Sequence, residues 1–221
     1  MDIAILGGTG DIGQGLALRW AHDTDHSVVV GSRERSRAVS KANEYETELE
    51  SMGREREIEG YENAEAAGRG ELVVLAVPAY HVADTVEAVA DELDDAILVT
   101  PAVGMQNEDG EMRYNPPGVG SVTELVAEAA PDGVPVVGAF HNLPAGRLAD
   151  LDADLEIDTL LVGDDGDAKD IVDDLADDVA GLRALDAGAL GNAAEVEAVT
   201  PLLVNVARHN KRLHDLGIRV Q

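Results

Sequence analysis

Residues 2–13 read Asp-Ile-Ala-Ile-Leu-Gly-Gly-Thr-Gly-Asp-Ile-Gly, and this stretch decides the fold. Its first five residues are mostly apolar and predict a strand, while apolar residues at helical spacing predict a helix over residues 11–22. Gly8, Gly10 and Gly13 stand between the two in the pattern G-x-G-x-x-G. A glycine turn that joins a strand to a helix in this way predicts the opening unit of a dinucleotide-binding domain.

Outward from this unit, apolar runs alternate with helical patterns, which indicates an α/β fold. Residues 71–77 are almost wholly apolar and are closed by Pro78, as expected for a central strand of a parallel sheet. We predict a Rossmann-type, doubly wound parallel sheet in residues 1–144 and a smaller C-terminal α/β domain in residues 145–221. Further strands are expected at residues 27–30, 58–61, 96–100, 135–140, 160–162 and 182–185, and helices at 34–52, 81–93, 121–130 and, as one long helix or two, 189–214.

The three glycines of the turn have separate physical tasks. Gly8 permits the tight turn, Gly10 lets a pyrophosphate approach the backbone, and Gly13 lets the helix pack closely against the strand. The helix N-terminus then offers free N–H groups and the positive end of its dipole to phosphates, and Thr9 adds a hydroxyl.

The end of the second strand indicates which dinucleotide binds. An NAD site places an acid there to hold the ribose hydroxyls, but this chain has Gly31, Ser32 and Arg33 before its first acid, Glu34. A hydroxyl and a guanidinium suit the 2′-phosphate of NADP, and Arg37 lies close enough in the next helix to add a second charge. We therefore predict NADP as the coenzyme.

Other strand ends are expected to complete the pocket, because ligands of open α/β sheets lie beyond the carboxyl ends of the strands. These ends are Val77 with Pro78, Thr100 and Pro101 with Val103, and His141 with Asn142. Their apolar character suits a nicotinamide ring.

The composition limits the partners that the protein can bind and indicates its cellular environment. The chain has 44 Asp+Glu against 16 Lys+Arg, a formal charge of −28, which argues against nucleic acid as a partner. It has no Cys, so disulfides and Cys-based metal sites are excluded. No apolar run is long enough for a membrane helix, and no cationic leader precedes the first strand, which predicts a cytoplasmic protein. The acid-rich, lysine-poor composition resembles proteins of a high-salt cytoplasm, where self-repulsion is screened.

The chain lacks the usual acid–base groups of several enzyme classes. No Tyr is followed by Lys at the Tyr-x-x-x-Lys spacing of short-chain dehydrogenases, and no pair of His forms a metal motif. We assign no catalytic acid or base, since hydride transfer between two cofactors needs mainly alignment and exclusion of water. Three alternatives stay open: reduction of a small carbonyl or imine with His141 as proton donor, reduction of a flavin or ferric acceptor, and NADP sensing without turnover.

The chain resembles the NADPH-dependent reductases of coenzyme F420. The resemblance is carried by the glycine turn with residues 15–19, by Val29 to Arg33, by Leu185-Asp186-Ala187-Gly188-Ala189-Leu190, and by Thr200 to Leu203. It implies a Rossmann domain and a small C-terminal domain, with the deazaflavin bound in the cleft between the two. It also implies a homodimer, and reversible hydride transfer between NADP(H) and coenzyme F420.

The resemblance also implies the cofactor-binding residues. NADP contacts are expected at Thr9, Gly10, Asp11 and Ile12 and at Ser32, Arg33 and Arg37, and the nicotinamide end is expected at Val77, His81, Val103 and Ala145. The loop after Gly104 is less regular than the family's. Arg147 and Arg208 are candidates for offsetting the negative charge of F420.

Overall fold

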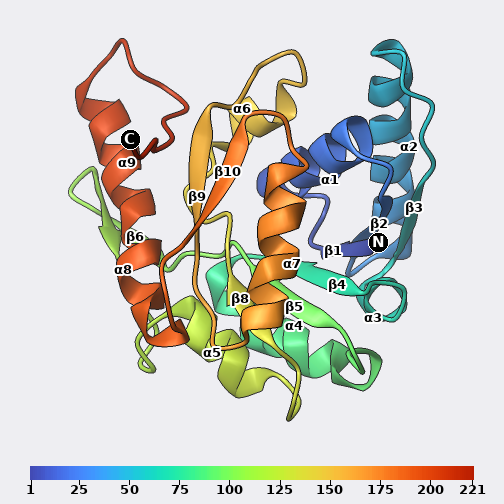
Figure 1. Ribbon diagram of the computed structural model, residues 1–221, viewed down its shortest axis with the longest axis horizontal. Helices are drawn as coiled ribbons and strands as arrows, with labels where there is room; N and C mark the ends of the chain where they lie inside the picture. The colour runs from blue at the N-terminus through green and yellow to red at the C-terminus, as the bar shows by residue number, and fades with distance from the viewer.

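The computed structural model describes residues 1–221 and is built around a six-stranded parallel sheet (Figure 1). The strand order is β3-β2-β1-β4-β5-β8, so the chain reverses its direction of travel across the sheet between β1 and β4. Every residue of β4 is buried, as a strand covered on both faces requires. The strands are β1 (Asp2–Leu6), β2 (Ser27–Ser32), β3 (Ile58–Glu62), β4 (Leu72–Leu75), β5 (Ile97–Thr100) and β8 (Val136–Gly138).

Helices cover both faces of this sheet and build two apolar cores. One core takes in α1 (Asp11–Asp23) and α2 (Arg35–Ser51), with Trp20 and Tyr45 fully buried. The other takes in α3 (Asn63–Ala67), α4 (Val82–Val89) and α5 (Val122–Ala129). The chain also contains three short 3-10 turns, η1 (Ala79–His81), η2 (Ala90–Glu92) and η3 (Leu190–Asn192). This is the doubly wound α/β fold predicted from the sequence.

The C-terminal part packs on the α1 side of the sheet and shares its core. Phe140 meets Trp20 edge to face at 5.7 Å between ring centroids, and Trp20 Nε1 donates to the carbonyl oxygen of Leu175 at 3.3 Å. The elements here are α6 (Ala145–Ala149), β9 (Ile157–Leu161), α7 (Gly166–Asp177), β10 (Leu182–Asp186), α8 (Ala193–Glu197) and α9 (Val199–His209). β9 and β10 pair in parallel as a small second sheet, with α7 as the crossover.

Two parts of the chain differ from the prediction. The loop after Gly104 contains an antiparallel hairpin of β6 (Met105–Glu108) and β7 (Glu111–Tyr114), turned at Asp109 and Gly110 with φ of 51° and 89°. Asp-Gly is the dipeptide that such a tight turn favours. The expected helix over residues 189–214 is wrong at its C-terminal end, because α9 ends at His209 and short elements precede it. No helix of the structure is both long and apolar enough to span a bilayer.

Candidate functional site

The glycine turn lies between β1 and α1, where the sequence placed it. Gly7, with φ of 77°, is the left-handed residue of the turn, a task that the sequence had suggested for Gly8. A Cβ on Gly13 would lie 2.6 Å from Gly8 Cα, so Gly13 is required for the close packing of helix and turn. A Cβ on Gly10 would have no neighbour nearer than 3.5 Å, which leaves the space above Gly10 open. The N-terminus of α1 carries no side-chain cap, so its first N–H groups are available to a ligand.

Tyr45 holds the turn from behind and was not foreseen from the sequence. Its hydroxyl donates to the carbonyl oxygen of Gly8 at 2.8 Å, and its side chain is 1% exposed. Burial raises the pKa of Tyr45, which keeps the hydroxyl protonated as a donor. Helical spacing alone marks Tyr45 as a core residue of α2, and only the fold shows which carbonyl it meets.

A cavity of about 510 Å³ opens over this turn and collects most of the predicted coenzyme residues. Its walls come from the β1–α1 turn, the end of β2 with the start of α2, and the segment from the end of β4 into α4. The predicted residues that line it are Thr9, Gly10, Ser32, Arg33, Arg37, Val77 and His81. Gly8, Asp11, Ile12 and Gly13 belong to the turn itself without lining the cavity wall.

Two exposed guanidinium groups face this cavity without a carboxylate partner. Arg33 and Arg37 line it and form no ion pair in the structure. Arg35, between them, points elsewhere: it pairs with Glu65 and lies 4.9 Å over the ring of Tyr61. Uncommitted cations beside open backbone N–H groups fit a phosphorylated dinucleotide.

The residues expected at the nicotinamide end are divided between two places. Val77 and His81 line the cavity over the turn, with the His81 ring 4.4 Å from the exposed ring of Tyr80. Ala145 begins α6 and lines a different pocket. Val103 is half-buried after β5 and lines neither of them.

The second pocket, of about 370 Å³, lies between the segment after β8 and helix α9. Its walls are mostly apolar, and its polar groups include Asn142, whose buried Oδ1 has no hydrogen-bond partner, and Arg208. Asn142 Nδ2 donates to the carbonyl oxygen of Asp158 at 2.7 Å, which fixes the amide with its oxygen unpaired. The remaining lining residues are Leu143, Pro144, Ala145, Thr200, Leu203, Val204, Ala207, Asp215 and Leu216. Arg147, the other candidate for anion binding, lies elsewhere and donates to the carbonyl oxygen of Asp154.

His141 is buried and does not line either pocket. Its Nε2 lies 3.4 Å from Thr123 Oγ1, which donates to Glu197 Oε1 at 2.9 Å, and its Nδ1 has no partner. Burial lowers the pKa of His141 to about 3, so its ring is neutral near pH 7. A neutral, enclosed imidazole gives no support to the alternative in which His141 donates a proton to a carbonyl or imine.

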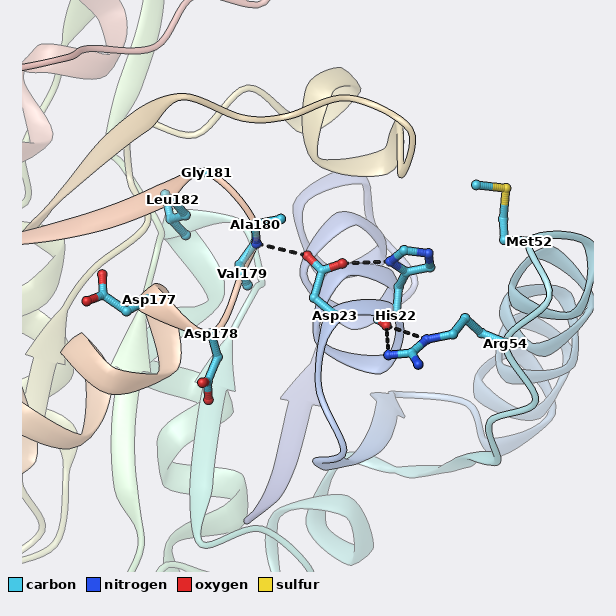
Figure 2. Close-up of a pocket in the computed structure, with 10 residues that line it drawn as sticks. All are labelled: His22, Asp23, Met52, Arg54, Asp177, Asp178, Val179, Ala180, Gly181 and Leu182. Atoms are coloured by element: carbon cyan, nitrogen blue, oxygen red, sulfur yellow. Dashed lines mark hydrogen bonds and ion pairs between the residues drawn. The ribbon is translucent and has the colours of Figure 1, made fainter.

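A third hollow, of about 400 Å³, lies where α1 and α7 end (Figure 2). Asp23 Oδ1 lies 2.6 Å from His22 Nδ1, and Asp23 Oδ2 accepts from the N–H of Ala180 at 3.1 Å. Arg54 donates through Nε to the carbonyl oxygen of His22 at 2.6 Å. These contacts join α1 to the segments at Arg54 and Ala180. The polar groups are partnered within the chain, so the hollow lacks the unpaired cations of the cavity over the glycine turn.

Comparison with known proteins gives a consistent result over the whole chain. A family described as "NADP oxidoreductase coenzyme F420-dependent" matches residues 2–104. A protein named "F420-dependent NADP reductase" from Methanocaldococcus jannaschii is 38% identical over 208 residues, 93% of this chain and 92% of its own. A protein of the same name from Methanothermobacter marburgensis is 38% identical over 224 residues, 100% of this chain and 98% of its own.

A solved structure supports the fold at lower sequence identity. A protein from Arthrobacter sp. FB24 superposes with a TM-score of 0.82 at 24% identity, covering 100% of this chain and 99% of that one. Both the sheet and the C-terminal elements therefore have a counterpart in an experimental structure.

Proposed function

The chain belongs to the family of F420-dependent NADP reductases, and we propose from its two pockets how it carries out that reaction. The cavity over the glycine turn takes NADP, and the pocket between the segment after β8 and α9 takes coenzyme F420. On this proposal residues 1–144 bind the nucleotide, and residues 145–221 close the deazaflavin site.

The observation that carries the NADP assignment is the meeting of three features in one cavity. The open space above Gly10 would admit the pyrophosphate, and the uncapped start of α1 would donate N–H groups to it. Ser32, Arg33 and Arg37 would hold the 2′-phosphate. Each charge-assisted hydrogen bond contributes about 1.5–3 kcal/mol, which is about 10- to 100-fold in affinity.

The F420 assignment is supported by the chemistry of the second pocket. Its apolar walls suit a planar ring, and the unpaired Oδ1 of Asn142 offers an acceptor to a ring N–H. Arg208 lines this pocket with Nη1 donating to the carbonyl oxygen of Gly110, and its positive charge would attract the negatively charged tail of F420. Ala145 lines this pocket and is one of the four residues that the family resemblance places at the nicotinamide end, which supports a meeting of the two rings there.

When both cofactors are bound, they supply the redox chemistry, with a hydride passing between C4 of the nicotinamide and C5 of the deazaflavin. The chain's own residues bind and orient the rings and exclude water. Alignment of this kind supplies about 7–11 kcal/mol of barrier reduction in well-oriented systems. The hydride turns NADPH into NADP⁺ and leaves the deazaflavin as its reduced anion, which takes a proton from solvent at a ring nitrogen, so we assign no side chain to proton transfer.

A spectrophotometric assay tests this proposal. Purified protein at molar salt is mixed with NADPH and F420, and the deazaflavin absorbance band is followed. We expect the band to bleach with NADPH and to stay nearly unchanged with NADH. Bleaching with FAD or FMN in place of F420, and none with F420, would favour the flavin-reductase alternative. Tight NADPH binding without oxidation by any acceptor would favour the sensing alternative.

The cellular location and the salt adaptation of the protein are a separate proposal. We propose a cytoplasmic protein adapted to high salt, for which the net charge of −28 is the support. Its melting temperature should therefore rise with KCl from 0.1 M to about 3 M, as screening increases.

We also propose a homodimer. Leu202 on α9 is 60% exposed, and Pro201 is the one buried residue of that helix. Sedimentation should give twice the mass of the chain, and Leu202→Glu should lower it.

A further inference from the structure

Asn63 is a cavity residue that neither the glycine turn nor the family resemblance assigns. It is the first residue after β3 and lines the NADP cavity together with Ser32, Arg33 and Arg37. β2 and β3 run in parallel, with Ser32 paired to Glu62, so Asn63 lies one step beyond the end of β2 at the same edge of the sheet.

Gly31 is the residue that lets Asn63 lie there. A Cβ built on Gly31 would come within 2.9 Å of Asn63 Oδ1 and 3.2 Å of Ala66 Cβ. Any larger residue at position 31 would therefore push the Asn63 amide away from the end of β2. The position of Asn63 therefore requires glycine at residue 31.

The Asn63 amide oxygen is an acceptor without a partner. Oδ1 is shielded from solvent and makes no hydrogen bond in the structure, which is unfavourable for a buried polar group. The terminal torsion of an asparagine is broad, so the amide can turn toward the cavity at little cost. Asn63 lines the cavity while its Oδ1 packs against Gly31, so a turned amide would present this unpaired acceptor to a ligand group that donates.

NADP has one such donor close to its 2′-phosphate, the 3′-hydroxyl of the adenosine ribose. NAD sites usually place a carboxylate at the end of the second strand to accept from the ribose hydroxyls, and here Ser32 and Arg33 occupy that place. The phosphate takes up donors, which leaves the 3′-hydroxyl in need of an acceptor. We propose that Asn63 accepts a hydrogen bond from the 3′-hydroxyl of the adenosine ribose, so that the ribose acceptor has moved from the end of β2 to the end of β3.

This inference rests on the proposed NADP site and separates two kinds of recognition within it. Arg33 and Arg37 would read the 2′-phosphate, which only NADP carries. Asn63 would read a hydroxyl that NADP and NAD share, and its neutral amide avoids the repulsion that a carboxylate would exert on the phosphate.

Equilibrium binding to the full chain without F420 tests the assignment. We expect Asn63→Ala to weaken NADP⁺ and NAD⁺ by the same factor, about 3- to 10-fold, as one neutral hydrogen bond predicts. Arg33→Ala is the matched control and should weaken NADP⁺ alone. Asn63→Asp keeps an acceptor but adds a charge, so NAD⁺ affinity should be retained while NADP⁺ affinity falls by about 10-fold or more.

A comparison of two ligands keeps the test valid if a variant is unstable. ADP and 3′-deoxy-ADP differ only in the hydroxyl concerned, and the wild-type chain should bind ADP about 3- to 10-fold more tightly. Asn63→Ala should bind the two equally, as a double-mutant cycle across the bond requires.

Equal binding of ADP and 3′-deoxy-ADP by the wild-type chain would overturn the assignment. Loss of NADP⁺ affinity alone in Asn63→Ala would overturn it too, because that pattern belongs to a phosphate ligand. A wild-type chain that does not prefer NADP⁺ to NAD⁺, or whose preference survives Arg33→Ala, would instead refute the proposed NADP site.

Discussion

The two pockets of this protein are built in opposite ways. The cavity over the glycine turn is lined by residues of the first 89 positions, and the residues proposed to bind phosphates follow one another along the opening β–α–β unit. The pocket beside α9 brings residues 142–145 together with residues 200–216. The first is recognisable in sequence because its backbone conformations demand glycine at fixed spacing. The second is mostly apolar side chains from segments that meet only in the folded chain. The sequence marked Asn142 as a strand end and Arg208 as a candidate cation, but no local pattern joins them into one pocket.

The largest expected effect is a loss of NADPH affinity with no effect on the F420 pocket. Gly10→Ala should lower NADPH affinity by about 100-fold, which corresponds to about 2.7 kcal/mol, because the added methyl group would stand where the pyrophosphate approaches. The methyl has open space in the protein itself, so the melting temperature should fall only slightly, because alanine is a poorer helix N-cap than glycine. Thermal unfolding and fluorescence titration with NADPH measure the two quantities. Gly13→Ala serves as the contrast, since its methyl meets backbone at 2.6 Å and should destabilise the fold.

The next effect tests why the protein should prefer NADPH to NADH. Arg33→Ala should raise KM for NADPH by about one to two orders of magnitude while leaving weak NADH use intact, because it removes one charge-assisted bond to the 2′-phosphate. Arg35→Ala is the matched control, as Arg35 pairs with Glu65 instead of facing the cavity. Equal losses with both nucleotides would show that Arg33 does not read the phosphate.

A substitution in the second pocket should impair the use of F420 and leave NADPH binding unchanged. Leu203 is half-buried and lines this pocket, so Leu203→Trp should narrow it and raise KM for F420 by about 10-fold, or about 1.4 kcal/mol. The dissociation constant for NADPH should be unchanged. Leu213→Trp, at an exposed position outside the pocket, controls for the added ring. Impaired NADPH binding with a normal KM for F420 would show that the pocket beside α9 binds NADPH, contrary to the proposed assignment.

The smallest effect concerns stability and not the cofactors. The pKa of His141 falls from its ordinary value of 6.5 to about 3 on burial, so acid protonates this residue in the unfolded chain before the folded one. Its contribution to the free energy of unfolding should decline by about 1.4 kcal/mol between pH 7.5 and 5.5. Urea unfolding at fixed salt should show this decline in the wild type and a shallower one in His141→Gln. Parallel slopes would mean that His141 binds its proton equally in the folded and unfolded chains, so that burial does not lower its pKa.

The same division explains what could be predicted from the sequence. The sheet follows from strand periodicity and the turn from glycine spacing, both of which are local, and several residues predicted to bind NADP line one cavity, although their binding of NADP stays a prediction. The hairpin at residues 105–114 was missed, although Asp109 and Gly110 were the signal for its turn. The Tyr45 bond to Gly8 and the placement of Asn63 beside Gly31 depend on which helix and strand become neighbours. No pattern along the chain contains that information.

A crystal structure of the protein with NADP⁺ and F420 both bound tests the account most directly. We predict the 2′-phosphate against Ser32, Arg33 and Arg37, the pyrophosphate over Gly10, and the deazaflavin against Leu203 and Asn142. A nucleotide bound away from the glycine turn, or a deazaflavin outside the pocket beside α9, would contradict the two-pocket assignment.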